Sequence, residues 1–255
     1  AKPDADFDNS CEVDYPDVAA LFDAWLLQDV LEVSDSGWLT TDIGDVNVLT
    51  GSYSDLGGGE FTMTGAGADI WGAADGGFYR YKSFPGDGRL TVRVTDISGP
   101  STNDWRKAGV MIRETLDAGS KHAFMSTSPV GGGGKAFQRR IETDLASTSA
   151  HDIPPTVTTP ICLRIAREGD TFRGFYNIGG GWVQQGDPVT IEMVENVYIG
   201  FAVTSHDYAN STTVTFDNVC SGDFIAQDLI TDGVINFEDY AEMMDAWLEK
   251  VLWPQ

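Results

Sequence analysis

Two acidic segments, one near each end of the sequence, carry oxygen-bearing side chains at the spacing that calcium ligation requires. Calcium takes about six or more oxygen ligands, and a loop of about twelve residues supplies them from alternating positions and the last one. The first segment offers Asp6, Asp8, Ser10, Glu12, Asp14 and Asp17 at these positions. The second offers Asp228, Ile230, Asp232, Val234, Asn236 and Asp239. The spacing predicts that both segments bind calcium.

The two loops differ in quality. Val234 stands where only the backbone carbonyl is used, so its apolar side chain does no harm. Ile230 stands where a side-chain oxygen is needed. We therefore expect the second loop to bind calcium more weakly than the first, or to complete its ligand set with water.

A helical pattern follows each loop directly. Apolar residues recur at helical spacing in both copies, and both copies end in the letters DAWL. These residues are Val18, Leu21, Phe22, Trp25 and Leu26 in the first copy, and Tyr240, Met243, Met244, Trp247 and Leu248 in the second. A lone helix cannot bury such a face against itself. The two copies are therefore expected to pack on each other, either within one chain or between two chains.

This loop-and-helix unit resembles one half of a type I dockerin, matched here as DFDNSCEVDYPD (6–17) and DLITDGVINFED (228–239). The resemblance implies calcium as the cofactor, an EF-hand-like helical pair formed by the two halves, and a cohesin-like protein as a possible partner. The chain departs from the dockerin pattern in two ways. Cys11 stands where glycine is usual, and a whole domain separates the halves.

Between these segments the pattern changes to short alternating runs separated by Gly, Asp-Gly and Pro, which is typical of β-strands and turns. Nine such runs predict strands over 78–84, 89–97, 107–114, 122–128, 135–142, 161–168, 171–178, 197–206 and 212–219. The sequence therefore predicts a mainly β fold, an antiparallel β-sandwich or jelly roll over 37–221. Terminal dockerin-like halves are expected over 1–33 and 223–255.

The middle region resembles the concanavalin A-like lectin/glucanase superfamily, and within it the DUF1349 group. The resemblance rests on GAGADIWGAADGGFYRY (65–81), WRKAGVMIRE (105–114) and LRIAREGDTFRGFYNIGGGW (163–182). Glucanases of this superfamily use two glutamates that flank an aspartate on one strand. The nearest match, Glu142 and Asp144, lacks the second glutamate. The chain is therefore expected not to be an enzyme.

Aromatic and basic residues in the middle region are candidates for ligand binding. Trp71, Trp105 and Trp182 could stack on sugars, although core packing is the more ordinary role of a tryptophan. Seven basic residues lie between 106 and 140, and they include Arg113 and Arg139 as candidate contacts to an acidic partner or an anionic glycan. Solvated strand faces are the alternative. Asp69, Asp75, Asp217 and Asn218 are candidates for a further calcium site.

Charge and cysteine content limit which partners the chain can have and in which compartment it acts. The net charge of −23 disfavours nucleic acids and anionic membranes as partners, and no apolar run is long enough to span a bilayer. The sequence starts at Ala1, as a processed chain would, so we expect a secreted protein. Of the three cysteines, Cys11 lies in the first repeat and Cys220 just before the second. A Cys11–Cys220 disulfide would join the two ends and would imply an oxidising compartment.

Two functions remain open on the sequence. The first is a non-catalytic, calcium-dependent extracellular module for binding or assembly with a lectin-like domain, for which carbohydrate is the candidate ligand. The second is a structural subunit whose terminal halves pair between molecules and build an extracellular filament or surface layer.

Overall fold

The structure is a computed structural model that describes residues 37–129, 132, 134–151, 159–179 and 181–222, with side chains as far as residue 219. The two predicted calcium loops, their ligands and their helices lie outside the described residues. So do Cys11 and the side chain of Cys220, and the predicted disulfide between them stays a prediction.

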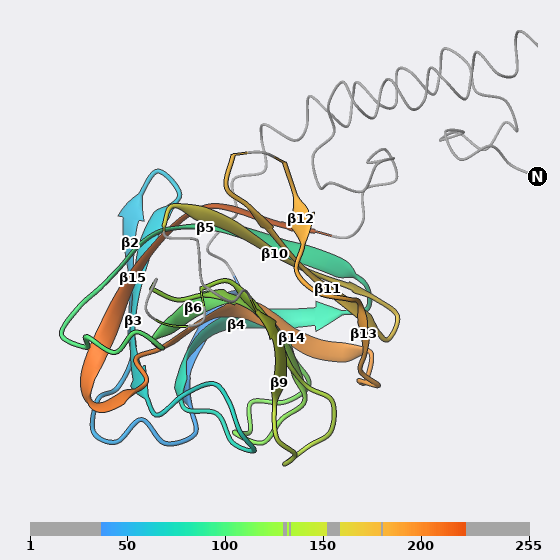
Figure 1. Ribbon diagram of the computed structural model, residues 1–255, viewed down its shortest axis with the longest axis horizontal. Helices are drawn as coiled ribbons and strands as arrows, with labels where there is room; N and C mark the ends of the chain where they lie inside the picture. The colour runs from blue at the N-terminus through green and yellow to red at the C-terminus, as the bar shows by residue number, and fades with distance from the viewer. Residues whose placement is uncertain (1–36, 130–131, 133, 152–158, 180, 223–255) are drawn as a thin grey trace, which may run out of the picture. The chain divides into compact units, whose positions relative to one another are not determined.

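The described residues form two antiparallel sheets that stack as a sandwich (Figure 1). One sheet has seven strands in the order β1-β4-β14-β6-β7-β8-β9. Its strands are β1 (Leu39–Ile43), β4 (Gly77–Pro85), β6 (Lys107–Arg113), β7 (His122–Thr127), β8 (Ala136–Arg140), β9 (Thr148–His151) and β14 (Asn196–Thr204). The predicted antiparallel β-sandwich is confirmed.

The other sheet has the order β12-β11-β10-β5-β15-β3-β2, and β13 pairs with β11 beside this path. Its strands are β2 (Ser52–Gly57), β3 (Glu60–Gly67), β5 (Gly88–Ser98), β10 (Ile161–Glu168), β11 (Thr171–Asn177), β12 (Val183–Gln184), β13 (Val189–Thr190) and β15 (Asp207–Gly222). All nine strands predicted from the sequence are present, and within the described residues the structure adds β1, β2, β3, β9, β12 and β13. No helix in the described part of the chain is long and apolar enough to cross a membrane.

The core lies between the two sheets and follows from the alternation along each strand. In β5, Leu90, Val92 and Val94 are fully buried, while the residues between them face away from the core. Aromatic rings join the two sheets, since Phe201 of β14 lies 5.2 Å from Phe61 of β3 between ring centroids. Burial of these large apolar side chains provides most of the stabilisation of such a fold.

The seven-stranded sheet is also covered on its second face, which we call the outer face because it points away from the core. Strand β6 is buried at every position for this reason. The loops 68–76 and 114–121 supply part of the cover, with Ile70 buried against Met111 and Phe124, and Leu116 packed on the same cluster. This second layer carries the candidate site.

Candidate functional site

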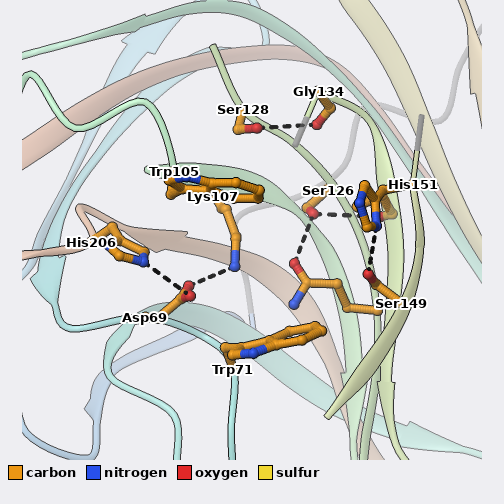
Figure 2. Close-up of a pocket in the computed structure, with 12 residues that line it drawn as sticks. Asp69, Trp71, Trp105, Lys107, Ser126, Ser128, Gly134, Ser149, His151 and His206 are labelled. Carbon is orange, nitrogen blue, oxygen red and sulfur yellow. Dashed lines mark hydrogen bonds and ion pairs between the residues drawn. The ribbon is translucent and has the colours of Figure 1, made fainter. Parts of the chain in front are cut away.

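A pocket of about 340 Å³ opens on the outer face of the seven-stranded sheet (Figure 2). It is lined by Asp69, Trp71, Trp105, Lys107, Ser126, Ser128, Gly134, Ala136, Gln138, Ser149, His151 and His206. Figure 2 shows Trp71 and Trp105 on opposite sides of the pocket, with Lys107 and Asp69 between them. Both indoles are partly exposed, at 39% and 45% respectively.

The floor of the pocket is low because one row of the sheet carries small side chains. Strand register places Gly109, Ser126, Ala136 and His151 side by side across β6, β7, β8 and β9. The neighbouring row holds Met111, Phe124, Gln138 and Ser149, which are mostly larger. Ser126 and Ala136 line the pocket with short side chains beside the longer Gln138 of the neighbouring row, and this step in side-chain size contributes to the hollow.

The Trp71 wall belongs to the loop between β3 and β4, and two side chains of β8 hold that loop in place. Gln138 donates from Nε2 to the carbonyl of Ile70 at 2.9 Å. Arg140 donates from Nη2 to the carbonyls of Trp71 at 3.3 Å and Gly72 at 3.0 Å. Both donors are buried, so these hydrogen bonds are shielded from water.

Arg140 also forms a buried ion pair at the base of the same loop. Its Nη2 lies 2.6 Å from Asp75 Oδ1 and its Nη1 lies 2.9 Å from Asp75 Oδ2, which is a bidentate contact. Arg113 and His122 each approach Asp75 Oδ2 to 3.4 Å. None of the four side chains is more than 1% exposed.

Ionisation in this cluster follows from burial and from the contacts. Burial alone raises the pKa of Asp75, but contacts with His122, Arg140 and Arg113 outweigh it and hold the pKa well below its usual range. Burial lowers the pKa of His122, and the nearby arginine charges lower it further while Asp75 opposes them. Asp75 is therefore charged and His122 neutral at pH 7.

The Trp105 wall is held by Asn103. The Asn103 Oδ1 accepts from the Trp105 backbone N–H at 2.9 Å, and its Nδ2 donates to His206 at Nδ1 (3.1 Å) and at the carbonyl (3.0 Å). Because Nδ1 accepts, the network assigns the ring proton to Nε2, which faces Asp69 Oδ2 at 3.4 Å. His206 has a φ of 51°, a backbone conformation that side chains other than glycine rarely adopt and that often marks functional sites.

Asp69 and Lys107 form an ion pair in the pocket, with Lys107 Nζ 2.6 Å from Asp69 Oδ1. The same ammonium lies 5.5 Å from the centroid of the Trp71 ring. Burial lowers the pKa of Lys107, and the attraction of Asp69 offsets part of that shift. The pocket therefore combines two aromatic faces with a balanced pair of charges and with neutral donors and acceptors, which suits an uncharged polar ring.

The structure brings together two of the five predicted ligand contacts, Trp71 and Trp105. Trp182 lies on the other sheet, where its ring packs on Arg164 at 3.9 Å. Arg113 is fully buried in the Asp75 cluster, so it cannot reach a ligand at the surface. Arg139 lies in β8 between Gln138 and Arg140, so strand alternation points it away from the outer face that carries the pocket.

The predicted further calcium site is wrong. Asp69 pairs with Lys107, Asp75 with Arg140 and Asp217 with Arg93, so the three carboxylates serve three different cations. Within the described residues, no group of three or more His, Cys, Asp or Glu side chains could hold a metal ion.

The expected basic surface between 106 and 140 is also not one exposed patch. Lys107, Arg113 and Arg140 are buried and paired with acids, and Lys121 pairs with Glu114 at 3.3 Å. The acidic pair nearest to the glucanase pattern, Glu142 and Asp144, lies in an exposed turn after β8. Cys162 of β10 is a half-buried free thiol.

Sequence reasoning missed Gln138, His151 and His206 as lining residues. A usable signal was present for Gln138, because small residues alternate with large ones at outward positions of adjacent predicted strands, and this predicts a hollow beside them. His151 carries no such signal, because it lies in β9, a strand that the sequence pattern did not predict. His206 carries none either, because its position depends on the turn between β14 and β15.

Comparison with known proteins supports the fold. No model of a known protein family matches the chain, and no curated protein is significantly similar to it. A functionally unknown protein from Saccharomyces cerevisiae superposes with a TM-score of 0.52 at 15% identity, covering 69% of this chain and 97% of its own. This likeness shows a shared fold.

Weaker structural similarity extends to two proteins whose names state carbohydrate binding or a lectin. The carbohydrate-binding module CBM66 from Bacillus subtilis has a TM-score of 0.46 and 18% identity, covering 72% of this chain and 94% of its own. Lectin II from Ulex europaeus has a TM-score of 0.44 and 6% identity, covering 73% and 93%. The narrower DUF1349 and dockerin resemblances stay predictions.

The buried cluster predicts a dependence of stability on pH. The folded protein keeps His122 neutral, whereas the unfolded chain protonates it near its ordinary pKa of 6.5. The unfolded state therefore binds more protons below that pH, and the free energy of unfolding should fall with decreasing pH by up to about 1.4 kcal/mol per unit. Urea denaturation between pH 7.5 and 5 measures this slope.

The chain has three histidines, which provides matched controls. His122→Gln should flatten the slope, and the double variant His151→Asn/His206→Asn should retain it. A slope that survives in His122→Gln would contradict the assignment.

Proposed function

We propose that the β-sandwich is a non-catalytic carbohydrate-binding module and that the pocket between Trp71 and Trp105 holds the sugar. The observation that carries the proposal is the pair of half-exposed indoles on opposite sides of one pocket. Exposed tryptophans are costly in water, and two of them facing one hollow indicate a ligand with apolar faces.

Sugars match the chemistry of this pocket. A pyranose ring presents C–H groups on its faces, which stack on indoles, and hydroxyls at its edge, which need donors and acceptors. Ser126, Gln138, Ser149 and the Asp69–Lys107 pair supply those groups. The volume of about 340 Å³ lies at the small end of the usual range for ligand pockets, so the site suits a short piece of a glycan.

Binding without hydrolysis fits the residues of the pocket better than catalysis does. Glycoside hydrolases place two carboxyl groups about 5–10 Å apart across the scissile bond. Among the described residues that line the pocket, Asp69 is the single carboxylate, and Lys107 already neutralises it. A second candidate, hydrolysis, has no residue pair to support it here.

Substitution of either wall tryptophan should weaken glycan binding. Trp71→Ala and Trp105→Ala each remove one stacking face, and each should raise the Kd about tenfold or more, which corresponds to about 1.4 kcal/mol. A glycan array on the wild type identifies a ligand, and isothermal titration calorimetry measures the variants. Trp182→Ala on the other sheet is the matched control and should bind as the wild type does. Equal affinity of all four proteins would contradict the proposal.

We also propose that the acidic terminal segments bind calcium and that the protein acts outside the cell. This proposal rests on the loop spacing in the sequence. Calcium would order each loop and its following helix, and the two halves would then pair. Pairing within one chain gives a closed binding module, whereas pairing between chains gives the assembling subunit that the sequence left open.

Calcium binding has a direct test. Calorimetric titration of the full chain with calcium should show two sites, the tighter removed by Asp6→Ala/Asp17→Ala and the weaker by Asp228→Ala/Asp239→Ala. Light scattering with calcium and then with a chelator separates the two modes of pairing. Assemblies that dissociate on chelation indicate pairing between chains, and a constant monomer indicates pairing within one chain. A titration without any heat of binding would contradict the calcium proposal.

A further inference from the structure

The Asp69–Lys107 pair has hydrogen-bonding capacity beyond the contact that joins the two residues. A lysine ammonium has three donors, and an ionised carboxylate accepts at about four positions. Within the described residues, Asp69 Oδ1 is the one hydrogen-bond acceptor recorded for Lys107, and Asp69 in turn faces Lys107 and His206. Both side chains line the pocket, so the remaining donors and acceptors are available to a ligand.

The pair is held in a defined orientation. The Nε2 proton of His206 faces Asp69 Oδ2, and Asn103 fixes the tautomer from the other side of the ring. The Lys107 side chain is 8% exposed, so its aliphatic part is packed and its ammonium has little freedom to move away. A ligand therefore meets the pair already in position, which lowers the entropic cost of binding.

The spacing of the pair matches two neighbouring hydroxyl groups. Lys107 Nζ and Asp69 Oδ1 are 2.6 Å apart, so they present a donor and an acceptor side by side. Two hydroxyls on adjacent carbons of a sugar ring lie at a similar separation, and a hydroxyl both donates and accepts. One hydroxyl accepts from Lys107 while its neighbour donates to Asp69. The Lys107 ammonium lies over the Trp71 ring at 5.5 Å from its centroid, so a sugar that contacts this indole lies beside the pair.

We propose that the Asp69–Lys107 pair recognises a vicinal diol of a neutral sugar stacked on Trp71. This inference rests on the proposed function and makes it specific. The two charges cancel, so the pair offers no excess charge to an anionic or a cationic sugar. A uronic acid carboxylate or an amino sugar ammonium at this place would meet both charges of the pair and gain no net attraction. Each would still lose its hydration in a partly desolvated site, which disfavours both.

The test uses defined probes. Saturation-transfer NMR and competition measure binding of methyl β-glucoside, β-galactoside, α-mannoside and β-xyloside, with methyl β-glucuronide as the charged counterpart. Monodeoxy derivatives of the glycoside that binds best then locate the hydroxyls that matter. For the wild type, removal of either hydroxyl of one adjacent pair should weaken binding at least tenfold, and the glucuronide should bind at least tenfold more weakly than the glucoside.

Variants assign each hydroxyl to its partner. Asp69→Ala removes the acceptor and should abolish the penalty for removing one hydroxyl. Lys107→Met removes the donor and should abolish the penalty for its neighbour, and the double variant should abolish both. The double variant also keeps the pocket neutral, and thermal unfolding checks that it folds. Asp217→Asn breaks the Arg93–Asp217 pair on the other sheet and is the matched control, which should leave the deoxy pattern unchanged.

The outcomes separate this inference from the proposed function. One outcome is that the monodeoxy derivatives lose the same affinity in the wild type as in the Asp69 and Lys107 single variants, while Trp71→Ala abolishes binding. In that case the diol inference is wrong and the binding function stands. If the glucuronide binds as tightly as the glucoside, the inference is also wrong. If none of the glycosides and no glycan of the array binds the wild type, the proposed function fails and the diol inference fails with it.

Discussion

The buried ion pair between Asp75 and Arg140 is the contact on which the loops that cover the outer face of the seven-stranded sheet depend. Arg140 places its donors on both oxygens of Asp75 and on carbonyls of the loops 68–76, 114–121 and 141–147. Three connections that are far apart in the sequence thus converge on one guanidinium. Loss of Asp75 would leave Arg113 and Arg140 without their counterion inside the protein, which costs about 3–5 kcal/mol in comparable buried pairs.

These covering loops form the walls of the pocket, and the sheet beneath them forms its floor. Arg140 binds the carbonyl of Trp71 and so holds the loop 68–76 beside β8, where Trp71 borders a row of small residues. Asn103 accepts from the Trp105 backbone and holds the opposite wall. Hydrogen bonds of polar groups therefore hold the walls in place. The short side chains of Ser126 and Ala136 leave the floor open. Walls held in this way lower the entropic cost of binding a ligand.

The sequence predicted the strands because alternation and turn residues are local signals, and all nine predicted strands lie where they were expected. Trp71 and Trp105 were predicted as candidates one by one. Their meeting at one pocket depends on strand register and loop anchoring, which are long-range properties. Arg113 shows the same limit, because alternation places it on the outer face but does not reveal that loops cover that face. Asp69 is one of four candidates for a further calcium site in the sequence, and its pairing with Lys107, 38 residues away, is visible only in the structure.

The most direct test of the pocket follows the indole N–H signals of the tryptophans by NMR while a glycan identified by the array is added. The chain has seven tryptophans, and single substitutions assign their signals. We predict that the signals of Trp71 and Trp105 shift together with one saturation curve while that of Trp182 stays in place. A shift of Trp182 alone, or saturable binding that leaves both pocket tryptophans unchanged, would contradict the assignment of this pocket as the carbohydrate site.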